Sequence, residues 1–229
     1  AVFWIYGQDL PSHESLAQYT PPTISRIYST EGRVIDEFAQ ERRLFTPADQ
    51  IPDLVKRAFI SAEDKNFYTH QGYDPRGIAA AVVDAVKSRG RDVRGASTIT
   101  QQVMKNFLLD GDRRAERKIK EIILATRVEQ ALSKEKILEL YLNEIFLGQN
   151  SYGVTAAAQT YFNKTLSELE PHEAAFLASM PKAPSDYHPV RNKERLLQRR
   201  DYVLREMHDN GYLSDEVYEQ ERAQPLRSV

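Results

Sequence analysis

The chain has 229 residues, of which 41% are hydrophobic and 28% are charged, a balance that suits one globular domain with a buried core. Its formal net charge of −2 provides no overall basic field, which argues against a nucleic-acid partner. The absence of cysteine excludes disulfides, thiolate metal sites and a cysteine nucleophile. The histidines are scattered and lack the spacing of a helical zinc site, so no protein-ligated metal is expected.

The N-terminus opens with an apolar run at residues 1–6. A membrane span needs about 20 apolar residues, so this run alone cannot cross a bilayer. It is compatible with the start of a strand, or with the trailing end of a membrane anchor that places Trp4 and Tyr6 at the interface. The proline-containing stretch 8–23 that follows is typical of an irregular linker.

The rest of the chain divides into a small β element and a long helical part. Residues 24–28 and 34–38 flank a turn at 30–32 and predict a β-hairpin, and no strand is expected after it. From Pro47 onward the apolar spacing is helical, beginning with a helix that includes residues 54–62. Further helices are predicted at 75–88, 97–108, 113–132, 134–146, 153–162, 171–179, 191–209 and 214–222. The fold class is therefore mainly α.

The first candidate for chemistry is Glu63, which opens the segment 63–72. It follows Phe59 by one helical turn, so a continued helix places its carboxylate beside the apolar face. A carboxylate with reduced solvation is suited to act as a general base. The alternative is an acidic helix end that is solvated together with Asp64.

A second candidate is the polar stripe of the segment 95–105. Thr98, Gln101, Gln102 and Lys105 recur at helical spacing and form one face that ends in a cation. Hydroxyls, amides and a lysine suit sugar hydroxyls and phosphate oxygens. An ordinary solvated helix face explains a polar stripe equally well.

The third candidate is Glu121, at the end of a basic cluster that begins at Arg113. It heads an apolar stripe that continues to Val128, so the pattern places a carboxylate against a buried surface. Arg117 lies one turn before it. The alternative is a simple helix ion pair between Arg117 and Glu121, which contributes about 0.3–0.5 kcal/mol.

Five motifs follow one another along roughly residues 45–205. They are Glu63-Asp64 with Phe67, His70 and Gly72; Gly95 with Ser97-Thr98-Ile99-Thr100-Gln101-Gln102; Arg117-Lys118 with Glu121; the run from Lys136 to Asn143; and Glu173-Ala174-Ala175 with residues 181–185. In this order the motifs resemble the glycosyltransferase domain of class A penicillin-binding proteins and of monofunctional peptidoglycan glycosyltransferases.

The resemblance implies a lysozyme-like, two-lobed helical domain with a large lobe, a membrane-facing jaw and a small N-terminal β-hairpin. It implies an enzyme at the extracytoplasmic face of the bacterial cytoplasmic membrane. The implied reaction joins lipid II into β-1,4-linked glycan strands, inverts the anomeric centre and releases undecaprenyl pyrophosphate. Implied partners are the lipid-linked glycan chain, the membrane surface, moenomycin-type inhibitors and other cell-wall synthesis proteins.

The same resemblance assigns roles to residues. Glu63 is expected to be the base for the acceptor 4-hydroxyl, and Glu121 is expected to assist at the donor end. The cations expected at the donor pyrophosphate are Lys105, Arg117 and Lys118. The polar residues expected to line the same cleft are Ser97, Thr98, Gln101 and Gln102. A divalent ion, Mg²⁺ or Mn²⁺, is expected only as one carried by the substrate pyrophosphate.

Domain organisation is expected to follow this pattern. Residues 1–44 are interpreted as an anchor stub, linker and hairpin, and residues 45–229 as the catalytic domain, a fragment of a bifunctional protein without its transpeptidase domain. Ser133 fits a serine-x-x-lysine pattern with Lys136, but it also stands where a helix N-cap belongs, which is the preferred interpretation. Thr155 and Asn163 depart from the family pattern, where a more acidic residue and a glycine are expected.

Two further hypotheses come from the sequence. The apolar cluster of Met104, Phe107, Leu108 and Leu109 is interpreted as part of the membrane-contacting jaw, with core packing of a helix end as the alternative. The nearest rival function is a lysozyme-like hydrolase or lytic transglycosylase, which needs no pyrophosphate clamp. The other rival is a catalytically silent scaffold, against which the presence of both glutamates argues.

Overall fold

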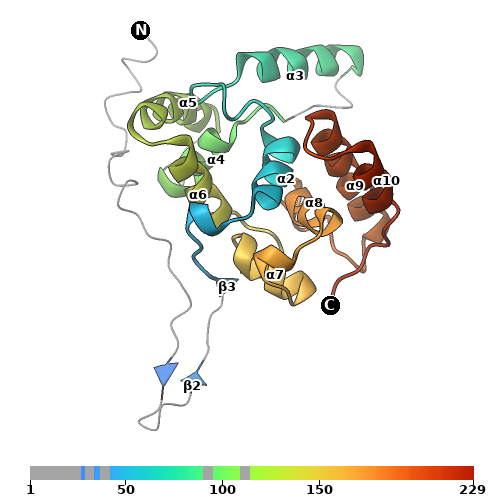
Figure 1. Cartoon of the computed structure of the whole chain (residues 1–229). Helices are drawn as coiled ribbons and strands as arrows, with labels where there is room; N and C mark the ends of the chain where they lie inside the picture. Colours follow the sequence, from blue (N-terminus) through green and yellow to red (C-terminus); the bar gives the residue numbers. More distant parts are fainter. Residues whose placement is uncertain (1–26, 29–33, 37–41, 90–94, 109–113) are drawn as a thin grey trace. The chain divides into compact units, whose positions relative to one another are not determined.

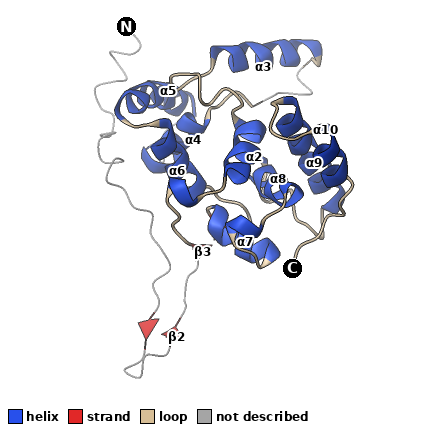
Figure 2. Cartoon of the chain, in the orientation of Figure 1, coloured by secondary structure: helices blue, strands red, loops and turns tan. Residues whose placement is uncertain are grey.

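The computed structural model describes residues 27–28, 34–36, 42–89, 95–108 and 114–229 (Figure 1). Helices dominate this part of the chain, and the strands are two or three residues long (Figure 2). The helices are α2 (Asp53–Glu63), α3 (Pro75–Lys87), α4 (Ile99–Leu108), α5 (Arg114–Ala131), α6 (Lys134–Glu144), α7 (Val154–Phe162), α8 (Pro171–Ser179), α9 (Lys193–Asp209) and α10 (Asp215–Arg222). Short 3₁₀ turns occupy Ala48–Gln50, Leu166–Glu168 and Met180–Lys182. The predicted mainly α class and its helices are confirmed.

The strand pairing of the predicted hairpin is confirmed where the structure describes it, while its turn at residues 30–32 lies outside the described residues. The expectation of no later strand was wrong. Strands β1 (Ile27–Tyr28) and β2 (Val34–Asp36) pair in antiparallel fashion. A second pair joins β3 (Arg42–Arg43) to β4 (Ser151–Tyr152) in parallel. Two residues are too few to show an alternating pattern, and pairing over such a separation depends on the tertiary fold.

The chain divides into two compact units. Within the described residues, the first unit is Glu63–Tyr141, and the second comprises the described part of Thr20–Ala62 together with Leu142–Val229. This division into units does not test the predicted domain boundary between residues 44 and 45, which stays a prediction. No helix in the described part of the chain combines the length and apolar character that crossing a membrane requires.

In the first unit, α4 packs against α5, and the loop between α2 and α3 packs against α5 as well. The closest approach is at Gly72, whose φ of +109° suits glycine. A Cβ at Gly72 would lie 2.6 Å from the backbone carbon of Ala125, so no larger residue fits. The apolar core of this helix pair is Ile99, Val103, Met104, Ile123, Leu124, Ala125 and Val128.

The second unit is built around α8, which is buried from Glu173 to Ser179. Its alanines allow close approach of α7 and α9, which pack against it. Phe176 of α8 meets the rings of Tyr161 and Phe162 edge to face, with centroids 5.0 and 4.9 Å apart. Glu170 and Glu173 form a capping box at the N-terminus of α8, which explains where this helix begins.

Candidate active site

Glu63 is the last residue of α2 and the first described residue of the first unit. The residue is half-buried, and its Oε1 atom is buried. The helix therefore continues far enough to hold Glu63 at its end, as the sequence predicted. Asp64 leaves the helix and begins the loop 64–72.

Asp64 and His70 fix this loop to the start of α4. The Oδ2 atom of Asp64 accepts a hydrogen bond from the backbone N–H of Ile99 at 3.0 Å, and His70 Nε2 lies 2.7 Å from the same oxygen. His70 Nδ1 accepts from the backbone N–H of Gly72 at 3.0 Å, so the ring proton belongs on Nε2 and is donated to Asp64. Asp64, the expected solvated partner in the alternative, is in fact buried.

Thr98 and Gln101 cap the N-terminus of α4 reciprocally. The N–H of Thr98 donates to Gln101 Oε1, and the N–H of Gln101 donates to Thr98 Oγ1, both at 3.1 Å. The Thr98 hydroxyl also donates to the carbonyl of Gly72 at 2.7 Å. The predicted polar stripe is therefore split: Thr98 and Gln101 are buried in structural bonds, while Gln102 is half-buried and Lys105 is exposed.

Glu121 is buried on α5 with 3% of its surface exposed. Burial raises the pKa of its carboxyl group, and the positive charges of Lys118, Lys105 and Arg117 act in the opposite direction without cancelling the effect. The sequence predicted burial of this carboxylate against the apolar stripe, and the structure confirms it.

Lys118 joins Glu121 to the residues before α4. Its Nζ lies 3.8 Å from Glu121 Oε1 and donates a hydrogen bond to Ser97 Oγ. Among the described residues, the ion pair of Glu121 is therefore with Lys118, three residues earlier, and not with Arg117 as the alternative supposed. Lys105 belongs to α4, while Arg117 and Lys118 belong to α5, so positive charges from two helices act to lower the pKa of this one carboxyl group.

The structure corrects the expected apolar contact surface at one of its four residues. Met104 is fully buried, and Phe107 and Leu108 are half-buried; Leu109 lies outside the described residues. Met104 therefore belongs to the core, as the alternative held.

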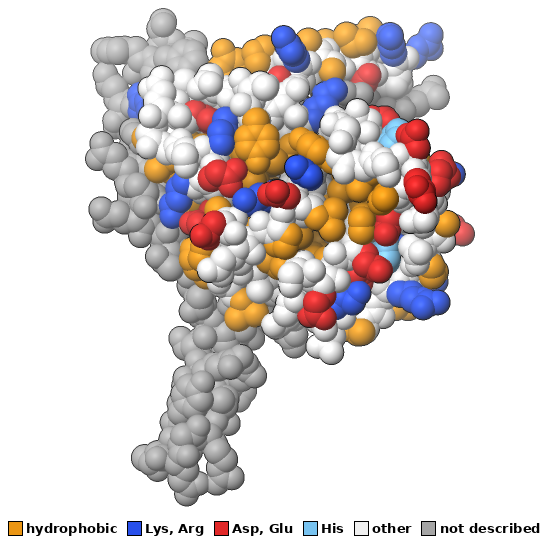
Figure 3. Space-filling model, viewed as in Figure 1, with side chains coloured by type: hydrophobic (Ala, Val, Ile, Leu, Met, Phe, Trp, Pro, Cys, Tyr) orange, Lys and Arg blue, Asp and Glu red, His pale blue; other side chains and the backbone are white. Residues whose placement is uncertain are grey.

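Exposed apolar side chains occur instead on α3. Figure 3 shows hydrophobic side chains along its upper edge, where Figure 1 draws this helix. The sequence predicted a helix at 75–88 but assigned no role to these side chains. The exposed residues are Ile78, Val82, Val83 and Val86, and the exposed cations nearby in sequence are Arg76, Lys87 and Arg89.

Ser133 acts as the predicted N-cap. Its Oγ accepts a hydrogen bond from the backbone N–H of Lys136 at 3.1 Å, which satisfies a donor in the first turn of α6. That bond supports the interpretation of the serine-x-x-lysine pattern as a helix start.

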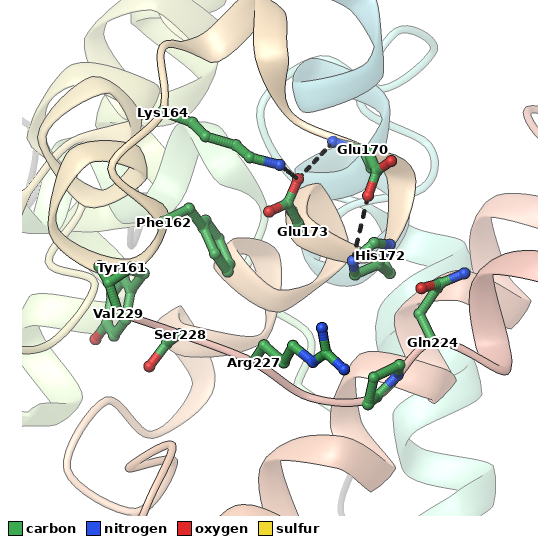
Figure 4. A pocket seen from close by; sticks show the side chains of 11 residues that line it. Tyr161, Phe162, Lys164, Glu170, His172, Glu173, Gln224, Arg227, Ser228 and Val229 are labelled. Atoms are coloured by element: carbon green, nitrogen blue, oxygen red, sulfur yellow. Dashed lines mark hydrogen bonds and ion pairs between the residues drawn. The ribbon is translucent and has the colours of Figure 1, made fainter.

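A cavity of about 440 Å³ lies in the second unit, apart from every predicted site residue (Figure 4). The side chains of Glu170, His172 and Glu173 gather at this cavity and could together approach a metal ion. Each has a structural partner: Glu170 caps α8, His172 Nδ1 lies 2.5 Å from Glu221, and Glu173 binds Lys164 at 2.8 Å. Sequence reasoning missed this cavity because distant segments line it.

The described part of the chain is thus mainly helical, and its first unit holds Lys118 beside the buried carboxylate of Glu121. The family model for transglycosylases matches residues 31–208. Penicillin-binding protein 1A of Rickettsia prowazekii (strain Madrid E) is 46% identical over 227 residues, which are 98% of this chain and 29% of that protein. The protein of the same name from Neisseria flavescens is 50% identical over 205 residues, which are 90% of this chain and 26% of that protein.

A crystal structure of penicillin-binding protein 1A from Haemophilus influenzae aligns with a TM-score of 0.54 and 29% identity. It covers 92% of this chain and 22% of that protein, and is consistent with the predicted lysozyme-like fold. The chain belongs to the transglycosylase family, as the peptidoglycan glycosyltransferase domain of class A penicillin-binding proteins. It spans less than a third of the length of these relatives.

Proposed function

We propose that the domain joins lipid II into β-1,4-linked glycan strands, inverts the anomeric centre and releases undecaprenyl pyrophosphate. The observation that carries this proposal is the buried carboxylate of Glu121 with Lys118 Nζ 3.8 Å away, on which the positive charges of Lys105 and Arg117 also act. A pyrophosphate leaving group needs cations to bind its charge, and charge-assisted hydrogen bonds are the strongest available for this purpose.

In this mechanism Glu63 removes the proton from the acceptor 4-hydroxyl, and the new bond forms as the donor pyrophosphate departs. The position of Glu63 at a helix end, followed by a loop fixed at several points, suits a base that must be held in place. Glu121 assists at the donor. Its raised pKa favours the protonated, neutral form of the carboxyl group, and a diphosphate repels this form less than it repels a carboxylate.

Arg117 offers a further binding group for the donor. Within the described part of the chain, its buried Nε has no hydrogen-bond acceptor. A buried donor without an acceptor is costly, and a phosphate oxygen can satisfy it. Ser97 and Gln102 complete the proposed donor site, while Thr98 and Gln101 hold the start of α4 by capping it. A divalent ion, Mg²⁺ or Mn²⁺, is proposed to enter with the pyrophosphate.

We also propose that α3 contacts the membrane from which lipid II enters. An exposed apolar face with basic residues at its ends is typical of a helix at an anionic lipid interface. Replacing Val82 and Val86 with serine should weaken flotation with anionic vesicles and leave the melting temperature unchanged. The matched control Val190→Ser, at an exposed valine outside α3, should alter neither. Vesicle binding by the α3 variant equal to that of the wild type would refute the contact.

The decisive experiment incubates the domain with lipid II in detergent and separates the lipid-linked products by size. Lengthening glycan strands that remain attached to the lipid support the proposal. A lysozyme-like hydrolase would instead release soluble muropeptides from purified cell wall, and a silent scaffold would do neither. Production of muropeptides without strand growth would overturn the assignment.

A further inference from the structure

Glu129 and Lys134 form a largely buried ion pair that the proposed reaction does not use. Lys134 Nζ donates to Glu129 Oε1 at 2.7 Å, and the hydroxyl of Thr100 donates to the same oxygen at 2.7 Å. The side chains of Glu129 and Lys134 are 3% and 19% exposed. The pair therefore joins α5 and the start of α6 to α4.

Lys134 also holds the loop 64–72. Its Nζ donates to the carbonyl of His70 at 2.8 Å and lies 4.6 Å from the centre of the Phe67 ring. One ammonium group thus binds the loop at two residues, and Glu129 fixes the direction in which that group points. Lys134 is the first residue of α6, so the loop depends on a helix that lies far along the chain.

The held loop leads directly to Glu63. The ring of His70 donates to Asp64, and Asp64 accepts from the N–H of Ile99, so the residue next to Glu63 is fixed in turn. Each link is buried and directional. A shift at the carbonyl of His70 is therefore passed along hydrogen bonds to the end of α2.

We propose that Lys134, oriented by Glu129, is a positioning residue for Glu63. This inference rests on the proposed function, because it takes Glu63 to be the base. Lys134 acts through His70 and Asp64. A displacement of about 1 Å at a reacting group can cost on the order of 10²-fold in rate, so this support matters for turnover.

The test begins with Lys134→Met, which keeps the length of the side chain and removes its charge and donors. Lys136→Met is the matched control, because Lys136 lies on the same helix and pairs with Glu139 at 3.0 Å. A buried Glu129 without its partner is expected to lower stability. A second variant, Lys134→Met with Glu129→Gln, removes that uncompensated charge and should recover most of the melting temperature.

Turnover separates positioning from a merely structural role. Lys134→Met and the double variant should both lose about 10-fold or more in kcat at a temperature where they are folded, whereas Lys136→Met should retain wild-type kcat. In a Glu63→Gln background the same Lys134→Met change should lower the residual rate by less than about 2-fold, because the group that it positions is absent.

Two outcomes would overturn the inference. One is recovery of kcat together with melting temperature in the double variant. The other is an equal loss from Lys134→Met with and without Glu63. Failure of the proposed function is a different result, in which the wild-type domain makes no glycan from lipid II.

In that case hydrogen exchange at the amide of Gly72 still tests whether Lys134 holds the loop. The exchange rate should rise at least about 10-fold in Lys134→Met and stay unchanged in Lys136→Met.

Discussion

Glu121 in the first unit and Glu173 in the second are both buried glutamates with a lysine close by, and their surroundings differ. Glu173 Oε1 accepts from Lys164 at 2.8 Å and from the backbone N–H of Glu170 at 2.9 Å. Lys118, by contrast, lies 3.8 Å from Glu121, beyond normal hydrogen-bond length. Burial is similar at the two carboxylates, whereas the closeness of the lysine is not.

The pKa directions follow from this difference. The hydrogen bond from Lys164 to Glu173 raises the pKa of the lysine. Burial raises the pKa of Glu121 in spite of the cations around it. Glu173 therefore resembles a structural cap, and Glu121 resembles a group kept available for a ligand. A buried carboxylate marks a functional site only when the protein leaves its charge incompletely compensated.

The largest expected effect is the loss of turnover when the carboxylate of Glu63 in the first unit is removed. Glu63→Gln should fold normally and lose roughly 10²–10⁴-fold in turnover of lipid II, because a positioned general base contributes about that much. The exposed Glu116 offers a matched control, and Glu116→Gln should retain full turnover. Near wild-type strand growth by Glu63→Gln would end its assignment as the base.

The next effect concerns the cations that distinguish the two regions. Lys105→Ala or Arg117→Ala should weaken binding of a moenomycin-type phosphoglycolipid by roughly 10- to 150-fold, since each charge-assisted hydrogen bond contributes about 1.5–3 kcal/mol. Glu63→Gln should bind this ligand almost as the wild type does. Calorimetric titration of the three variants gives the answer, and unchanged affinity in both cation variants would remove the pyrophosphate site from the mechanism.

The sequence predicted most of the helices and the burial of Glu121, because both follow from local apolar spacing. The structure explains one departure from the family pattern. Asn163 ends α7 with a φ of +53°, a conformation that glycine favours and asparagine tolerates. The other departure, Thr155, binds Thr46 through the two hydroxyls at 2.5 Å. That partner lies far away in the chain, so no local pattern could reveal it.

What the sequence missed has the same physical origin. The parallel pairing of β3 with β4, the Glu129–Lys134 pair and the cavity of the second unit all join segments that are distant in sequence or belong to different elements. The sequence also assigned Thr98 and Gln101 to a ligand, although their spacing equally fits a capping pair. The roles of the predicted site residues in substrate binding stay predictions.

A smaller effect tests the structural half of the comparison. Glu173→Ala removes the cap bond to Glu170 and the partner of Lys164, and should lower the free energy of unfolding by about 1–2 kcal/mol. This corresponds to a fall in Tm of about 2–8 °C for a chain of this size. Glu173→Gln keeps an acceptor for the cap and should lose less. Turnover should be unchanged in both variants, and a Tm equal to that of the wild type would show that the bonds to Glu173 contribute little.

The smallest expected effect is a gain in stability from Glu121→Gln. Because the folded chain raises the pKa of Glu121, the folded state holds its proton more tightly than the unfolded state does. The contribution of this group to stability is therefore fully present below the unfolded pKa of about 4.5 and is lost as the pH rises through the higher folded pKa. At neutral pH the buried, ionised carboxylate lowers the free energy of unfolding. Glutamine removes this charge while keeping the shape of the side chain.

Denaturant titrations at pH 4 and pH 7 should show near-equal stability of variant and wild type at the lower pH. At the higher pH the variant should be ahead by about 1 kcal/mol or less, with the exposed Glu116→Gln as the unchanged reference. If Glu121→Gln were the less stable protein at pH 7, attraction to Lys118, Lys105 and Arg117 would outweigh burial. Glu121 would then be a compensated structural carboxylate like Glu173, and the contrast between the two units would fail.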